Sequence, residues 1–161
     1  MSTRVGIGYD SHRFAPGGPI ILGGVTIAAD VSLIGHSDAD AIAHALTDAI
    51  LGAAAAGDIG ALFPDTDRAN ERRDSIEMLR TAMESVRELG YSVCNADVTV
   101  IAELPRIGPH VPAMRQRLAD ALGIGIGAVS VKGKTNERMG WIGRAEGIAC
   151  IAVATITSDP Q

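Results

Sequence analysis

The chain of 161 residues is 47% hydrophobic, 20% charged and only 3% aromatic, with a formal net charge of −5. One domain over residues 1–161 suits this length. The acidic balance disfavours nucleic acid and anionic membrane as partners, and the scarcity of aromatic rings disfavours base stacking. The sequence has neither an apolar run of about 18 residues nor a signal-peptide core, and Cys94 and Cys150 lack metal-ligand spacing. We therefore expect a cytoplasmic protein with two buried free thiols.

The first third of the sequence predicts short strands followed by a long helix. Residues 4–9 alternate as a strand that leads into the polar sequence DSH. Two apolar segments flank Gly23-Gly24 and predict a β-hairpin. The segment GHSDAD then opens a helix over residues 38–55, because apolar residues recur there at spacings of three and four. The apolar stripe of this helix is Ile42, Leu46, Ala49, Ile50 and Ala53.

The remaining elements follow from turn formers and periodicity. Residues 57–67 are rich in turn formers and predict a loop. A second helix begins at Asp74, where DSIE has the form of a capping box, and it ends before Gly90. Its buried face is predicted to consist of Ile76, Leu79, Met83, Val86 and Leu89. Later elements are a strand over 91–102, a helix over 109–122, a strand over 129–132, a polar loop over 133–141 and a strand over 146–157.

This order predicts an α+β fold, a sandwich in which helices cover one face of a mixed β-sheet. The strand over 146–157 is apolar on both alternating faces, which is typical of a strand covered on both sides. We expect homo-oligomerisation to cover the second face.

Asp10 and His12 form the first candidate pair for chemistry. Residues two apart on a strand point to the same face, so the carboxylate and the imidazole project together. Both side chains are good zinc ligands. The alternative is a solvated strand end at which Asp10 caps a turn, because this short pattern is common.

Asp40, His44 and Asp48 follow at intervals of four and share one helix face, roughly opposite the apolar stripe. His44 can complete an Asp/His/His site that leaves a fourth position for substrate, as catalytic zinc sites require. The alternative is a solvated polar stripe. Three of the four histidines lie close in sequence to several carboxylates, which favours the functional interpretation. Asp40 or Asp48 is then expected to orient an imidazole as a hydrogen-bond acceptor.

Two loops carry polar side chains without a definite signature. Residues 58–67 either supply local caps or hold a polyol through its hydroxyls. The segment KGKTNE, residues 132–137, lacks the spacing of a Walker A loop. Its lysines and hydroxyl still suit phosphate oxygens, and Glu137 suits a hard divalent cation. The alternative for this second loop is a solvated charged turn.

Taken in order, four motifs resemble the 2-C-methyl-D-erythritol 2,4-cyclodiphosphate synthase family over nearly the whole chain. They are GYDSHRF, GHSDADAIAHALTDAILGAAAAGDIGALFPDTD, DVTVIAELPRIGPH and KGKTNERMGWIGRAEGIA. The resemblance implies a phosphorus–oxygen lyase of isoprenoid precursor biosynthesis. Its substrate would be 4-diphosphocytidyl-2-C-methyl-D-erythritol 2-phosphate. The 2-phosphate would attack the β-phosphorus of the same molecule, so that a cyclic diphosphate forms and CMP leaves.

The resemblance also implies two metal sites. Zn²⁺, or another divalent cation, would bind Asp10, His12 and His44. Mg²⁺ or Mn²⁺ would bind Glu137 and bridge the substrate diphosphate. No departure from the family pattern removes one of these ligands.

The substrate contacts are implied in the same way. His36 and Thr135 would stabilise the transition state, and His36 and Ser37 would contact phosphate; Asp10 and His12 would belong to the substrate-binding set as well. The methylerythritol-binding segments match Asp58, Ile59, Gly60, Phe63, Pro64, Asp65, Thr66 and Asp67. The cytidine-side segments, which a neighbouring subunit would provide, match Ala102, Glu103, Leu104, Pro105, Arg106, Ile107, Gly108, Lys134, Thr135, Asn136 and Glu137.

The assembly implied by the family is a homotrimer with active sites at subunit interfaces. Trp141 and Arg144 match positions near a central cavity, where family members can hold an isoprenoid diphosphate. The chain departs from the expected pattern in a less Thr-rich loop, with Lys134 and Asn136, and in Trp141 where Phe is expected. Two other functions stay open: a zinc-dependent phosphohydrolase that uses water as nucleophile, and a non-catalytic trimeric metabolite sensor.

Overall fold

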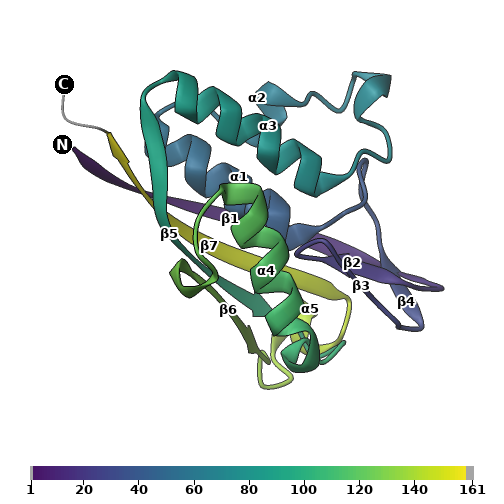
Figure 1. The fold of residues 1–161 in the computed structure, drawn as a ribbon. Helices are drawn as coiled ribbons and strands as arrows, with labels where there is room; N and C mark the ends of the chain where they lie inside the picture. The colour runs from purple at the N-terminus through teal and green to yellow at the C-terminus, as the bar shows by residue number, and fades with distance from the viewer. Residues whose placement is uncertain (1, 159–161) are drawn as a thin grey trace.

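The structure, a computed structural model, describes residues 2–158, so that residues 1 and 159–161 of the predicted domain lie outside it (Figure 1). Its main feature is a five-stranded sheet in the order β4-β1-β7-β5-β6, accompanied by a hairpin of β2 and β3. The strands are β1 (Thr3–Pro16), β2 (Ile20–Leu22), β3 (Val25–Ile27), β4 (Val31–Leu33), β5 (Tyr91–Ile101), β6 (Val129–Lys134) and β7 (Gly147–Ser158). The helices are α1 (Ala41–Ala54), α2 (Ile59–Leu62), α3 (Ser75–Glu88), α4 (Val111–Leu122) and α5 (Gly140–Gly143). Short 3-10 turns are η1 (Arg68–Asn70), η2 (Gly108–His110) and η3 (Ile126–Ala128).

The sheet is mixed, because β5 and β6 run parallel whereas the other neighbours are antiparallel. Helix α1 packs on β1 and β7, α4 packs on β6, and α3 covers α1 and α4 (Figure 1). The predicted α+β fold with a mixed sheet is therefore confirmed. Within residues 2–158, no helix is both long enough and apolar enough to cross a membrane.

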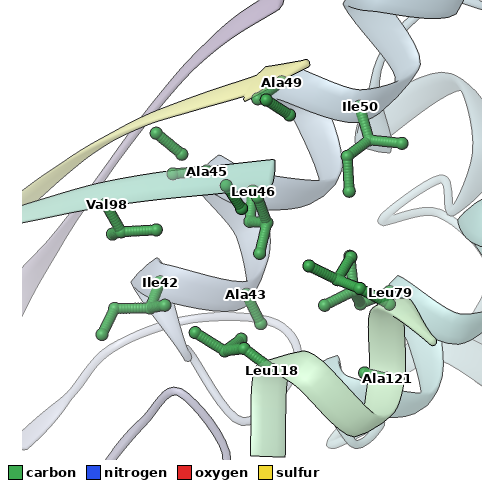
Figure 2. Close-up of a cluster of buried hydrophobic side chains, with 14 of the residues drawn as sticks. Ile42, Ala43, Ala45, Leu46, Ala49, Ile50, Leu79, Val98, Leu118 and Ala121 are labelled. Atoms are coloured by element: carbon green, nitrogen blue, oxygen red, sulfur yellow. The ribbon is translucent and has the colours of Figure 1, made fainter. Parts of the chain in front are cut away.

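The core lies between the sheet and the three long helices. Every residue of the predicted apolar stripe of α1 is buried. Figure 2 shows side chains from α1, α3, α4 and β5 gathered in this core, among them Leu46, Leu79, Leu118 and Val98. Burial of such aliphatic side chains stabilises the fold by about 1.5–3 kcal/mol each.

Two glycines of β1 let α1 lie directly against the strand. A Cβ atom at Gly8 would lie 1.8 Å from the carbonyl oxygen of Ala45, and one at Gly6 would lie 2.0 Å from that of Ala49. No larger residue fits at either position without moving the helix backbone. This close contact brings His44, next to Ala45, against β1.

The sheet face turned away from the helices is apolar and open in a single chain. The exposed fractions are 66% for Val5, 70% for Ile7 and 56% for Tyr9 on β1. Ile7 pairs with Val153 and Tyr9 with Ile151 on β7, and both partners are also exposed. One chain thus buries only one face of β7, although the sequence predicts cover on both.

Several predicted boundaries are corrected. Strand β1 continues to Pro16, so Asp10 and His12 lie inside a strand and not at a strand end. Strand β4 was not expected; it forms by pairing with the end of β1. The predicted loop over 57–67 contains α2, whose first turn is capped by Asp58.

Helix α3 begins as predicted, but its capping box is half formed. The carboxylate of Asp74 accepts hydrogen bonds from the backbone N–H groups of Ile76 and Glu77. The Glu77 carboxylate pairs with Arg80 and does not reach back. Leu89, predicted in the buried face, is the C-cap of α3 and is 55% exposed.

The cysteines meet the expectation in part. Both are free, as predicted, and Cys150 is buried. Cys94 is exposed, next to an irregularity in the pairing of β5 with β7. The prediction of two buried thiols is wrong for Cys94.

Candidate metal and phosphate site

Asp10, His12 and His44 converge on one point. Each contributes one ligand atom, and these atoms lie within 4.8 Å of one another. Asp10 Oδ2 lies 2.8 Å from His12 Nε2 and 3.3 Å from His44 Nδ1, and the two ring nitrogens are 3.2 Å apart. The first two side chains share one face of β1, and His44 projects from the first turn of α1. The predicted cluster is therefore formed.

The atoms of Asp10 and His12 that face each other, Oδ2 and Nε2, are both hydrogen-bond acceptors when the imidazole is neutral. His12 Nδ1 lies 2.8 Å from the carbonyl oxygen of Ile34, which can only accept, so Nδ1 carries the ring proton. In the neutral ring, Nε2 then faces Asp10 Oδ2 with a lone pair. Among residues 2–158, no hydrogen-bond donor satisfies this buried oxygen. Facing acceptors at such a distance require a positive charge between them, either a proton or a metal ion.

The pKa values of Asp10 and His12 also indicate that the cluster favours a positive charge. Burial opposes charge and by itself raises the pKa of Asp10, but the imidazoles of His12 and His44 beside it lower this pKa overall. Burial by itself lowers the pKa of His12, but the neighbouring Asp10 carboxylate raises it overall. The cluster therefore attracts a cation. One carboxylate and two imidazoles are a donor set that suits zinc and related divalent ions.

Asp40 has a different role from the predicted one. It is fully buried, and its carboxylate accepts hydrogen bonds from Gly23 N at 2.8 Å and Gly24 N at 2.7 Å. It also caps α1 by accepting from Ile42 N and Ala43 N, both at 3.1 Å. Burial raises the pKa of Asp40 to about 6. Asp40 thus fastens the β2–β3 turn to the start of α1, and the interpretation as a solvated stripe is wrong for it.

Asp48 does not orient an imidazole either. Its carboxylate accepts a hydrogen bond from Ile59 N at 2.7 Å, which ties the start of α2 to α1. The groups that hold the outer ring nitrogens are the carbonyl of Ile34 and the hydroxyls of Ser37 and Ser75. The prediction that Asp40 or Asp48 orients a histidine is therefore wrong.

A cavity of about 180 Å³ opens beside the cluster. It is lined by His12, His36, Ser37, His44, Ile59, Gly60, Phe63, Asp65, Asn70 and Met78. The structure therefore brings the first polar strand, the start of α1 and the segment after α1 to one site. Asn70 and Met78 were not predicted from the sequence, because neither belongs to a polar motif.

Other predicted residues of this segment lie outside the lining. The Asp58 carboxylate accepts from Ala61 N at 2.8 Å and caps α2. The Asp67 carboxylate accepts from Ala69 N at 2.9 Å and caps η1. Pro64 and Thr66 are exposed beside them. These local caps are the alternative that the sequence left open, so the segment supplies both caps and cavity walls.

A second cavity, of about 520 Å³, lies where β5 and β6 end. It is lined by Val100, Ala102, Glu103, Pro105, Arg106, Ile107, Gly108, Pro109, Gly133, Lys134 and Thr135. The structure thus joins the two segments predicted for the cytidine side. Leu104, Asn136 and Glu137 adjoin this lining in sequence without being part of it.

The loop after β6 is held in a strained form by one carboxylate. Glu137 and Arg138 have positive φ angles of 51° and 60°, which non-glycine residues rarely adopt. Glu103 Oε1 accepts hydrogen bonds from Asn136 N at 3.0 Å and Arg138 N at 3.1 Å. The Thr135 hydroxyl donates to Glu137 Oε1 at 3.2 Å. Glu103 therefore fixes the backbone that carries Thr135 and Glu137, the two side chains predicted to act on phosphate and its cation.

The two cavities lie at separate parts of the sheet. Across the strands, Asp10 pairs with Cys150, Cys150 with Val100, and Val100 with Gly133. Three strand spacings separate the ends of this row, which is about 14 Å. One chain therefore brings Asp10, His12 and His44 together but leaves Glu137 in a different region.

A third cavity, of about 270 Å³, is lined by Ser11, Arg13, Trp141 and Glu146. Ser11 and Arg13 are exposed and alternate with the half-buried Asp10, His12 and Phe14, so they continue the exposed sheet face beyond Tyr9. The guanidinium of Arg144 pairs with Glu146, with Nε 2.6 Å from Oε1. Trp141 and Arg144 are thus both near Glu146, Trp141 in the lining of the same cavity and Arg144 through its ion pair.

Comparison with known proteins identifies relatives over the whole length of the chain. The model of the YgbB family matches residues 3–157. The 2-C-methyl-D-erythritol 2,4-cyclodiphosphate synthase of Gemmatimonas aurantiaca is 60% identical over 97% of this chain and 94% of its own.

Solved structures agree with this similarity. The bifunctional IspDF of Campylobacter jejuni superimposes with a TM-score of 0.94 at 40% identity, over 98% of this chain and 43% of that longer one. The CDP complex of IspF from Plasmodium falciparum superimposes with a TM-score of 0.87 at 34% identity, over 99% of this chain and 98% of its own. The chain therefore belongs to the YgbB family, that of the 2-C-methyl-D-erythritol 2,4-cyclodiphosphate synthases.

Proposed function

We propose that the chain converts 4-diphosphocytidyl-2-C-methyl-D-erythritol 2-phosphate to 2-C-methyl-D-erythritol 2,4-cyclodiphosphate and CMP, as a phosphorus–oxygen lyase. The observation that carries this proposal is the convergence of Asp10, His12 and His44 beside a cavity, in a chain 60% identical to a synthase of this name. The substrate brings its own phosphate nucleophile, so the chain needs no nucleophilic Ser or Cys. Its task is to hold two phosphates in line and to offset their mutual repulsion.

Asp10, His12 and His44 would hold Zn²⁺ or another divalent cation. Their fit is supported by the unsatisfied Asp10 Oδ2 and by the lone pair that His12 Nε2 directs at it. Three protein ligands leave a position open for a substrate oxygen. When bound, such a cation offsets phosphate charge and polarises the phosphorus–oxygen bonds.

The other polar residues of the site would orient the phosphates. His36 is exposed at the rim of the small cavity and can donate a hydrogen bond to a phosphate oxygen, as can the Ser37 hydroxyl. Lys134 and Thr135 line the larger cavity and would stabilise the diphosphate. Glu137, beside them, would hold Mg²⁺ or Mn²⁺ together with substrate oxygens.

We propose further that the active unit is a homotrimer in which neighbouring chains share each site. The three strand spacings, about 14 Å, that separate Asp10 from Gly133 within one chain support this arrangement. The exposed apolar sheet face supports it as well. The larger cavity would then hold the cytidine of a substrate whose phosphates reach a neighbour's Asp10, His12 and His44. The CDP-bound relative supports a cytidylyl ligand.

In such a trimer the third cavity would lie near the central axis, because it continues the exposed sheet face. Trp141 would offer an apolar surface there, and Arg13 and Arg144 would offer positive charge. This combination suits an isoprenoid diphosphate.

The proposed reaction is tested by incubating the protein with the substrate and following phosphorus NMR, with and without a chelator. We expect CMP and the cyclic diphosphate in equal amounts, loss of both with chelator, and recovery when the metal is restored. The His12→Ala variant should lose metal and cyclisation together. Release of inorganic phosphate would indicate a phosphohydrolase instead. Binding without either product would indicate a sensor.

A further inference from the structure

We infer that Asp38 acts through Ser75 as a positioning residue for His44, by deciding which nitrogen of the His44 ring carries the proton. This inference rests on the proposed metal site, because its consequence is a stronger metal ligand.

Ser75 connects the two groups. It is the first residue of α3 and is fully buried, and its Oγ lies 2.8 Å from His44 Nε2. The same hydroxyl is in hydrogen-bond contact with the Asp38 carboxylate, which also accepts from Ser75 N at 3.1 Å. Asp38 and His44 come from the loop before α1 and from α1, whereas Ser75 comes from α3, more than 30 residues further along the chain.

The positions of the protons follow from what each group can do. An ionised carboxylate only accepts hydrogen bonds, and a hydroxyl has one proton to give. Ser75 therefore donates to Asp38, and its oxygen is left to accept from His44 Nε2–H. A neutral imidazole has only one N–H, so Nδ1 of His44 keeps its lone pair. That lone pair faces Asp10 Oδ2 at 3.3 Å and His12 Nε2 at 3.2 Å.

The Ser37 hydroxyl also contacts His44 Nε2, but it does not determine whether this nitrogen carries the ring proton. Its Oγ is 2.9 Å from His44 Nε2 and 3.3 Å from Ser75 Oγ, and it accepts from Ala39 N at 3.3 Å. No carboxylate contact fixes the direction of the Ser37 proton within residues 2–158. Its hydroxyl is thus free to turn toward a phosphate in the cavity that it lines.

Asp38, acting through Ser75, thus keeps the ring proton of His44 on the outer nitrogen, Nε2. The Ile34 carbonyl does the same for His12 at Nδ1. Partners of this kind hold the ring in place and increase the basicity of the ligating nitrogen, and their loss typically costs about 10–100-fold in metal affinity.

The test uses two variants and two measurements. Ser75→Ala removes the connection. Asp38→Asn keeps the shape but puts an amide N–H₂ in place of one carboxylate oxygen. In the wild type, Oδ1 accepts from Ser75 Oγ and from Asp40 N at 3.2 Å, and Oδ2 accepts from Ser75 N at 3.1 Å. In the orientation that keeps the acceptor for Ser75 N, the N–H₂ faces the Ser75 oxygen, so the Ser75 proton points to His44 Nε2 and the ring proton moves to Nδ1, the metal-facing nitrogen.

Nitrogen-15 NMR of the metal-free protein, at a pH where both rings are neutral, reads the ring proton directly. We expect His44 to carry it on Nε2 in the wild type and on Nδ1 in Asp38→Asn. Competition with a chromophoric chelator measures the zinc Kd, which should rise about 10–100-fold in Ser75→Ala and in Asp38→Asn. The double variant should bind no more weakly than the weaker single variant, because the two residues act in series. The matched control, Ser85→Ala, removes an α3 hydroxyl that only reaches the Thr81 carbonyl, and it should leave the Kd unchanged.

The outcomes separate this inference from the proposed function. If the wild type binds no zinc, the proposed metal site is wrong. The NMR measurement alone then tests whether Asp38 and Ser75 determine which His44 nitrogen carries the proton. If the wild type binds zinc and both variants keep its Kd and its Nε2 proton, the role of Asp38 and Ser75 is overturned. Additive losses in the double variant would also overturn it. Circular dichroism of each metal-free variant distinguishes a lost contact from a lost fold.

Discussion

His12 and His44 present opposite ring nitrogens to the same point. His12 donates outward through Nδ1 and faces Asp10 with Nε2, whereas His44 is held at Nε2 and faces Asp10 with Nδ1. One ring projects from β1 and the other from α1, which packs along this strand. Each ring meets a hydrogen-bond partner on its outer side, so that both inner nitrogens are available to a cation.

The pKa of His12 predicts how metal affinity depends on pH. Burial lowers this pKa, but Asp10 and the Ile34 carbonyl raise it above the ordinary 6.5. Below the raised pKa the metal-free site holds a proton that the metal must displace. The zinc Kd should therefore be constant at higher pH and rise about tenfold per pH unit below the pKa of His12.

Chelator competition across a pH series measures this dependence. The break should lie above 6.5, the ordinary value. A break below that value, or a Kd independent of pH, would contradict the interpretation of His12 as a ligand that competes with a proton.

The sequence predicts Asp10, His12 and His44 as candidate ligands, but it does not predict the groups that hydrogen-bond to the outer ring nitrogens of the two histidines. Asp10 and His12 share a face because strand side chains alternate with period two, which is visible in any strand. The Ile34 carbonyl lies 22 residues from His12, and Ser75 lies 31 residues from His44. These partners are set by how the elements pack, and no local pattern marks them. Asp48 was misassigned for the same reason, since its real partner is a backbone N–H of α2.

At the scale of elements, the contact of β1 with α1 determines the site, because it brings the ligands of both elements together. A Cβ at Gly8 would meet backbone atoms of α1, which cannot move as a flexible side chain can. We expect Gly8→Ala to destabilise the protein by about 1–3 kcal/mol or more. The metal site should weaken as well, since His44 moves away from Asp10. Thermal unfolding and the zinc Kd measure the two effects.

Gly52→Ala is the matched control for this substitution. Gly52 lies in α1 with no atom within 4 Å of an added Cβ. This variant should gain about 0.5–1 kcal/mol, because alanine favours the helix. If Gly8→Ala unfolds at the temperature of the wild type, the close packing does not limit stability.

The loop after β6, residues 135–139, provides a second prediction at this scale. Glu103→Ala removes the acceptor for Asn136 N and Arg138 N, so the strained loop should relax. Turnover should fall by about tenfold or more, since losing an interaction with a charged group costs about 1.5–3 kcal/mol. Glu103→Gln keeps an acceptor oxygen and should retain most activity. Faster amide hydrogen exchange over residues 135–139 in Glu103→Ala only would locate the effect in the loop. Equal loss in both variants would mean that the charge of Glu103 matters and the backbone contacts do not.

Helices with a strong period of apolar residues could be predicted from the sequence, whereas strands that form by pairing with a distant strand could not. The helices α1, α3 and α4 have apolar residues at helical spacing, and each was found close to its predicted range. The polar end of β1 does not look like a strand, yet residues as far as Arg13 pair with β7. Strand β4 has three residues and exists through its pairing with the end of β1. Such strands depend on a distant partner more than on their own sequence.

At the scale of the whole molecule, a single chain leaves two features incomplete. The residues proposed to bind one substrate are divided between two cavities, and Asp10 and Gly133, which lie near them, are three strand spacings apart, about 14 Å. The sheet face that carries Val5, Ile7 and Tyr9 is apolar and uncovered. The proposed symmetric assembly through this face would resolve both, because it would bury the apolar surface and bring the loop after β6 of one chain toward Asp10, His12 and His44 of another.

Ile7→Lys tests this assembly. Ile7 is 70% exposed and opposite Val153 at the centre of the open face, so the fold of one chain tolerates a lysine there, whereas a packed interface does not. Light scattering should give a mass near three chains for the wild type and near one chain for Ile7→Lys. Cyclisation should be lost with the trimer, while the far-UV circular dichroism stays the same. Leu89→Lys is the control, because Leu89 is 55% exposed at the end of α3, on the helical side of the molecule. It should remain trimeric and active. A single-chain form of Ile7→Lys that cyclises substrate at the wild-type rate would show that each chain has a complete site of its own.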